Sequence, residues 1–212
     1  MPGNIVTAKV EIIGIRSLFF HSAGPDMIPL EKQETTGVAG NDPWGWSKTT
    51  PVTAEGQLYL DPTMVFATIR DGGRHIKIKR GSLMMPIIAT LQIVDDIILV
   101  DRFLPPEATE FVRSKGKVGH PLEVLTQDPT ADVFLDVRKG KNPNTKSALI
   151  IYRVACTAGW HASFTLQWDR TVVATQQLEA ALRDAGALEG LGSGRKIGKG
   201  RFTHTSFQVT ES

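Results

Sequence analysis

The sequence is poor in the residues from which disulfides and metal centres are built. Its 212 residues include one cysteine, Cys156, and five histidines. A single cysteine cannot form an internal disulfide, and the histidines show no metal-ligand spacing. We therefore expect a buried thiol, no metal site, no cofactor and a reducing, cytoplasmic setting.

Long apolar runs are also lacking. The longest candidate, 87–100, is interrupted by Thr90, Gln92, Asp95 and Asp96, so it falls short of the roughly 18 residues of a membrane span. The first residues show neither the basic segment nor the apolar segment of a secretory signal. These features predict a protein without membrane contact.

Neither positive nor negative charge dominates the sequence. It contains 24 Lys and Arg residues and 22 Asp and Glu residues, which gives a net charge of +2. Sixteen of the basic residues nevertheless fall in four short stretches, and Asp71 is the only acidic residue among them. The stretches are 70–80, 113–117, 138–146 and 195–201. If they meet in space, they form a cationic surface suited to a polyanion; the alternative is four separate solvated loops.

The first half of the chain alternates strand and helix patterns. Apolar alternation predicts a strand over 5–15. A helix is expected over 60–73, with Asp61 as N-cap, Pro62 at the first helical position and Gly72 at the C-terminal end. Two further stretches have strand character: 75–83 as a short strand or hairpin arm, and 87–100 as a strand pair or one bent strand.

The second half repeats this alternation. The β-rich runs 147–156 and 160–168 predict a hairpin across a short connection. A helix over 175–186, which Gly186 can end, precedes a glycine-rich segment and a last strand.

These elements together predict an α+β fold of the ferredoxin-like (RRM-like) type, an antiparallel sheet with two helices and inserted loops. We expect a single domain over 1–212, with a long loop at 22–57 and an inserted region at about 101–147. A loop as long as the first of these is more often functional than filler.

The most informative segment is GALEGLGSGRKIGKGRF, residues 186–202, which interleaves six glycines with four basic residues. Glycines let backbone amides approach a ligand closely and form an anion-binding nest, and the basic side chains add charge. Neither a P-loop nor a dinucleotide-binding pattern fits, and the segment follows a helix instead of opening one. The phosphates of a polynucleotide are the better target, and a flexible, solubilising surface loop is the alternative.

In this position, AGALEGLGSGRKIGKGRFTHTSF resembles the C-terminal glycine-rich loop of the RAMP superfamily, the RNA-binding proteins of CRISPR effector complexes. The earlier LYLDPTMVFATIRDGGR is similar, more weakly, to the segment that opens the first helix of the superfamily's backbone subunits. The resemblance implies an RRM-like subunit that grips guide or target RNA through its phosphates, stacks with copies of itself and joins other effector subunits.

On this hypothesis two groups of residues contact RNA. The first lies at the end of the first helix and just beyond it, and the second lies in the glycine-rich loop. Their members are Arg70, Arg74, Lys77, Lys79 and Arg80, and Gly192, Gly194, Arg195, Lys196, Gly198, Lys199 and Arg201.

Two tryptophans and three lysines have less specific patterns. Trp44 and Trp46, in the long loop, are candidates for base stacking or for packing against a neighbouring subunit, and equally for a small core beneath the loop. Lys139, Lys141 and Lys146 flank an Asn-Pro-Asn turn and form either a basic finger or a solvated hairpin tip.

The evidence for catalysis is weak. His21 and Asp26 lie in the loop after the first strand, where some RAMP relatives carry a cleaving residue, but neither spacing nor a partner supports them. Three functions stay open: a non-catalytic RNA-binding backbone subunit, which we favour; a stand-alone RAMP endonuclease that processes repeat RNA; and a structural or assembly protein without nucleic acid.

Overall fold

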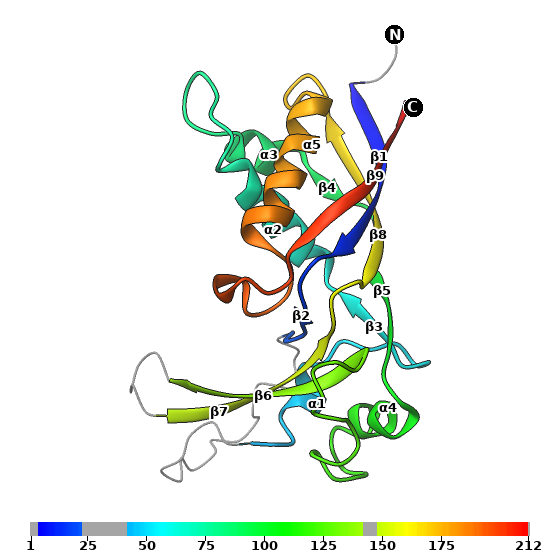
Figure 1. Ribbon diagram of the computed structural model, residues 1–212. Coiled ribbons are helices and arrows are strands. Elements are labelled where there is room, and N and C mark those ends of the chain that lie inside the picture. The colour runs from blue at the N-terminus through cyan, green and yellow to red at the C-terminus, as the bar shows by residue number, and fades with distance from the viewer. Residues whose placement is uncertain (1–3, 23–41, 142–147, 212) are drawn as a thin grey trace, which may run out of the picture. The chain divides into compact units, whose positions relative to one another are not determined.

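The computed structural model describes residues 4–22, 42–141 and 148–211, and these divide into two compact units. The first unit comprises Met1–Leu18, Tyr59–Asp101 and Ala158–Ser212, and the second comprises Phe19–Leu58 and Arg102–Thr157. The segments 22–57 and 101–147, expected as a loop and an insertion, fall in the second unit apart from Asp101. Both segments carry helices or strands of their own (Figure 1).

The sheet of the first unit is centred on β1 (Ile5–Gly14), which pairs antiparallel with β8 (His161–Asp169) and β9 (Phe202–Glu211). Its order is β3-β5-β8-β1-β9, with β4 paired to β8. The added strands are β3 (Gln57–Leu60), β4 (Gln92–Ile93) and β5 (Ile98–Phe103). The α+β class is confirmed.

Along the chain, β1, α2, β4, β8, α5 and β9 alternate in the order that the ferredoxin-like prediction requires. Strands β3 and β5 extend the sheet beyond β8 and are not part of that scheme. The finer assignment to the ferredoxin-like type stays a prediction.

Two helices, α2 (Pro62–Gly73) and α5 (Thr175–Asp184), lie side by side against this sheet (Figure 1). The expected cap of α2 is confirmed, because Oδ1 of Asp61 accepts a hydrogen bond from the Thr63 amide at 2.7 Å. At the start of α5, the Gln177 side chain accepts from the Ala174 amide at 3.1 Å. The buried faces of the strands and helices form the core through alternating or helically spaced apolar side chains.

Gly72 and Gly186 were expected to end helices, but the structure gives them a different role. Gly72 lies inside α2 against α5, where a Cβ atom would sit 2.3 Å from the Ala181 carbonyl oxygen. Gly186 lies in a π-helical turn, Ala185–Glu189, where a Cβ would sit 2.2 Å from the Phe202 carbonyl oxygen. Both positions need glycine for close backbone approach, and the positive φ of +80° comes later, at Gly190.

Of the short strand or hairpin arm expected over 75–83, no strand forms, and only a minimal antiparallel turn is present. The segment forms a turn in which the Ile78 amide donates to the Gly81 carbonyl, with one bridge between Lys77 and Ser82. The strand prediction for 87–100 is wrong for its first residues, which belong to α3 (Met84–Thr90). The buried Leu83, Ile87 and Leu91 recur every four residues, a helical spacing that outweighs the β-rich composition.

The predicted hairpin of 147–156 with 160–168 does not form. The first run is β7 (Ala148–Cys156), which pairs with β6 (Val133–Lys141) in a second sheet of order β2-β7-β6, where β2 is Leu18–Phe19. The second run is β8, whose apolar side pairs with that of β1, as at Val10 and Phe164. Between the runs, the Gly159 amide donates to the Gly14 carbonyl at 2.7 Å and directs β8 to β1.

The second unit has its own core. Trp46 begins α1 (Trp46–Thr49) and packs on Phe111 of α4 (Pro106–Arg113), with ring centroids 4.6 Å apart. Phe19, in β2 (Leu18–Phe19), clusters with Phe134 and Ala155. The thiol of Cys156 is buried, as predicted.

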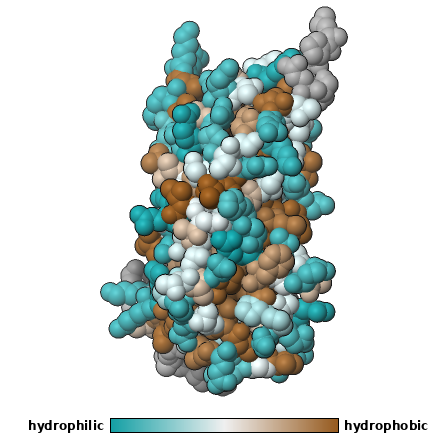
Figure 2. All heavy atoms as spheres, turned by 45° about the vertical axis from the view of Figure 1, so that its right-hand side comes forward, coloured by the Kyte–Doolittle hydropathy of each residue, from teal (hydrophilic) through white to brown (hydrophobic). Residues whose placement is uncertain are grey.

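Apolar and hydrophilic side chains are interspersed over the face that Figure 2 shows. No helix among the described residues is long and apolar enough to cross a membrane.

Candidate nucleic-acid interface

The glycine-rich segment folds into a loop that is closed at its neck. The Leu191 amide donates to the Gly200 carbonyl at 2.9 Å, and the Gly200 amide donates to the Ser17 carbonyl at 2.8 Å. At the tip, a 3₁₀ turn, Arg195–Ile197, stands between Gly194 and Gly198, whose φ angles are +76° and +79°. The glycines therefore build a defined turn on which Lys196 is exposed and Arg195 is half-buried.

Six backbone amides of this loop are engaged within the protein and cannot join the expected nest. Besides the two neck amides, the amide of Gly190 donates to the Ala185 carbonyl, and the tip amides donate back to Gly194 and Arg195. These tip amides are those of Ile197, Gly198 and Lys199. An amide that closes a turn is not available to a phosphate, so these six amides do not contribute to a nest.

A buried carboxylate joins the loop to the end of α2. Asp71, 5% exposed, accepts hydrogen bonds at Oδ1 from Arg70 Nε and Nη2, at 3.0 and 2.8 Å, and from Arg74 Nη2 at 3.0 Å. Its Oδ2 lies 3.5 Å from Nη1 of Arg195. Three guanidinium groups share one carboxylate, so this cluster retains an excess of positive charge.

Two further contacts hold the loop on α2. The Thr68 hydroxyl lies within hydrogen-bond distance of the Gly190 carbonyl, at 3.1 Å, and also of the Met64 carbonyl, at 2.8 Å. His75 Nε2 lies 2.7 Å from the Glu189 carboxylate. The structure thus brings together two of the four basic stretches, 70–80 and 195–201, which the sequence places far apart.

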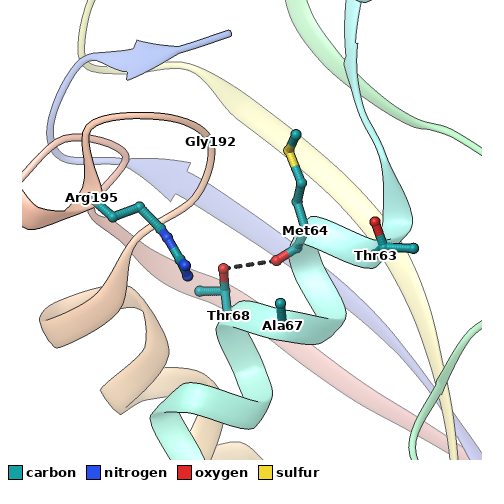
Figure 3. A pocket seen from close by; sticks show the side chains of 6 residues that line it. All are labelled: Thr63, Met64, Ala67, Thr68, Gly192 and Arg195. Carbon is teal, nitrogen blue, oxygen red and sulfur yellow. Dashed lines mark hydrogen bonds between the residues drawn. The ribbon is translucent and has the colours of Figure 1, made fainter. Parts of the chain in front are cut away.

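A pocket of about 240 Å³ opens between α2 and the loop. Figure 3 shows the Arg195 side chain reaching from the loop toward Thr68, with Met64 and Thr63 farther along the helix. The lining residues are Thr63, Met64, Ala67, Thr68, Gly192 and Arg195. A guanidinium beside hydroxyl and apolar groups suits a sugar-phosphate unit: Arg binds phosphate in a planar, bidentate manner, and the other walls accommodate the sugar.

The remaining predicted RNA contacts differ in exposure. Lys77, Lys79 and Arg80 are exposed on the turn after α2, and Lys196 is exposed at the loop tip. Lys199 and Arg201 are half-buried. Nη1 of Arg201 is buried and has no hydrogen-bond partner among the described residues.

The two tryptophans of the long loop have different surroundings. Trp46 is 1% exposed, and its Nε1 donates to the Pro121 carbonyl at 3.2 Å, so it is a core residue and base stacking is excluded. Trp44 is 43% exposed and makes an edge-on contact with His120. Lys139 and Lys141 are exposed on β6, whereas Lys146 lies outside the described residues.

Of the two candidate catalytic residues, Asp26 lies outside the described residues. Partial burial lowers the pKa of His21, and the positive charge of Arg153 lowers it further. Both effects favour the neutral imidazole near pH 7, a form that accepts a proton more readily than it donates one.

Asp71 was visible in the sequence only as the single acidic residue within the four basic stretches. The residues that line the pocket or hold the loop lie within the two segments that resemble RAMP proteins, but no pattern singled them out; they are Thr63, Met64, Thr68 and Glu189. Their roles depend on the contact between α2 and the loop, which spans more than a hundred residues of sequence.

We expect Asp71→Asn to lower the free energy of unfolding by about 2 kcal/mol, because three guanidinium groups lose their shared anion. Chemical denaturation followed by circular dichroism measures the change. Asp96→Asn, at an exposed position, removes the same charge and is the matched control. Equal stability of the two variants would contradict the structural role of Asp71.

No protein-family model and no curated protein matches the sequence. Among solved structures, a chain of the "Cryo-EM structure of the Type III-B Cmr-beta bound to cognate target RNA" matches with a TM-score of 0.50 and 13% identity. The match covers 98% of this chain and 61% of that chain, so this chain spans about three fifths of that chain's length. At this identity the likeness shows the fold alone.

Proposed function

We propose that this protein is an RNA-binding subunit of a CRISPR-type ribonucleoprotein that grips the phosphate backbone of guide RNA. The observation that carries the proposal is the shared carboxylate of Asp71, which gathers Arg70, Arg74 and Arg195 beside an open pocket. One carboxylate neutralises one of the three charges, and the excess attracts an anion.

The exposed cations around this cluster favour a chain of phosphates over a single one. Lys77, Lys79 and Arg80 follow α2, and Lys196 stands at the loop tip next to Arg195. Contacts to several successive phosphates give affinity without sequence preference, as a subunit that must hold any guide sequence requires.

Assembly into a larger complex is part of the proposal. The fold is similar to that of a chain from the Cmr-beta structure, whose title states that it is bound to cognate target RNA. By analogy, this protein associates with copies of itself along guide RNA, with other effector subunits and with a target nucleic acid, in the cytoplasm. The resemblance of the glycine-rich loop to that of the RAMP superfamily supports the same reading.

The test is the double variant Arg195→Ala/Lys199→Ala, measured by fluorescence anisotropy with single-stranded RNA. We expect the affinity to fall roughly 30-fold near physiological salt, and the slope of log K against log salt to shrink by about 1.4, which is 0.7 for each lost phosphate contact. The control Arg113→Ala/Lys117→Ala removes two exposed charges from the second unit and should change the affinity little.

Unchanged affinity and slope in the first variant would refute the proposed interface. An RNA substrate cut by the wild type but not by His21→Ala would identify an endonuclease instead. A protein that binds no RNA at any salt concentration would favour a structural role.

A further inference from the structure

A second hollow lies beside the first on α2 and has different chemistry. It has a volume of about 360 Å³ and is lined by Pro62, Thr63, Phe66, Gln92 and Ile93. Thr63 belongs to both hollows, and in Figure 3 it lies at the end of the first pocket that is remote from Arg195. A strand of RNA held at Arg195 that continues along α2 would therefore reach the second hollow next.

The walls of the second hollow suit a flat, uncharged group. Phe66 and Ile93 are half-buried and offer an aromatic ring and an aliphatic surface, while the side chain of Gln92 is exposed at the rim. An amide carries both hydrogen-bond donors and an acceptor, the combination that can pair with a base edge. A space of this size accommodates one nucleobase.

The charge at this end of α2 is opposite to that at the first pocket. The carboxylate of Asp61 caps the helix and is bonded to the amide and hydroxyl of Thr63, at the border of the second hollow. An anion there disfavours phosphate but not a neutral base. The two hollows thus differ in chemistry: the first has the cationic Arg195, and the second has the aromatic Phe66.

We infer that the hollow formed by Phe66, Gln92 and Ile93 binds one nucleobase of the RNA, stacked on the Phe66 ring. The inference rests on the proposed function, because it requires an RNA strand on the Arg195 side. Stacking on an aromatic ring tolerates any base, so this site adds affinity while the subunit still accepts any sequence.

The experiment compares two probes of equal length: oligouridine RNA and an abasic ribose-phosphate oligomer, which has the same charges but no bases. Phe66→Leu keeps the apolar bulk and removes the ring. We expect its affinity for oligouridine to fall roughly tenfold, with no change for the abasic oligomer and none in the salt dependence. Phe66→Tyr, which retains the ring, should bind like the wild type.

Phe103→Leu is the matched control, because Phe103 is 55% exposed and lines neither hollow. Unchanged oligouridine affinity in Phe66→Leu, with RNA still bound by the wild type, would overturn the inference and leave the proposed function standing. Equal losses for both probes would also overturn it, because they would indicate a structural defect. A wild type that binds neither probe would refute the proposed function itself.

Discussion

Replacing Gly200 by alanine is expected to destabilise the protein by at least about 3 kcal/mol. The φ angle of Gly200 is +68°, and a Cβ atom would lie 1.9 Å from the Leu191 carbonyl oxygen. The overlap is with backbone, so a change of rotamer cannot relieve it. The neck of the loop, where Gly200 bonds to Leu191 and Ser17, must open.

Gly198→Ala is the matched control for this prediction. Its φ angle of +79° is equally unfavourable for alanine, but no atom lies within 4 Å of the added Cβ. It should therefore cost only about 1 kcal/mol, the strain of the backbone conformation alone. Denaturant titration with circular dichroism compares the two, and similar losses would show that the neck is not closed as described. Gly200→Ala should also weaken RNA binding, because Arg195 would lose its fixed position.

The sequence predicted correctly those helices and strands that are determined by residues within the element or next to it. The cap of α2 is set by Asp61 and Pro62, adjacent to the helix, and the strand β1 alternates along its whole length. The pairing of strands, in contrast, could not be predicted from neighbouring residues. The run 160–168 had a suitable neighbour in 147–156, but it pairs with β1, more than 140 residues away in sequence. Competition between near and distant partners is decided by tertiary packing.

In the candidate site, too, local features could be predicted and features that depend on tertiary contacts could not. Basic residues and glycines could be found by composition, and these led to both halves of the interface. The carboxylate that joins the halves could not, since an acidic residue in a basic stretch has no meaning until Arg195 is seen beside it. The amide nest is limited for a related reason: a glycine-rich sequence permits exposed amides, but the fold uses six of them to close the neck and the tip of the loop.

Trp46→Ala should destabilise the second unit by about 3–5 kcal/mol, the cost of emptying a buried aromatic site. The Trp46 ring packs against Phe111 of α4, and its Nε1 donates a hydrogen bond to the Pro121 carbonyl. The variant therefore loses both packing and a hydrogen bond. Hydrogen exchange followed by mass spectrometry should show faster exchange in 42–58 and 102–125, with smaller changes in the β1–β8 sheet of the first unit.

Trp44→Ala provides the contrast, because this ring is 43% exposed and touches only the edge of the His120 ring among the aromatic pairs of the described residues. Its stability should change by less than about 1 kcal/mol, as for most surface substitutions. Comparing the two variants distinguishes the two roles that the sequence left open for these tryptophans, namely contact with a base or a subunit and packing in a small core. A loss of RNA affinity in Trp44→Ala without a loss of stability would mark Trp44 as a contact to base or subunit, whereas equal destabilisation by both variants would contradict the packing described for Trp46.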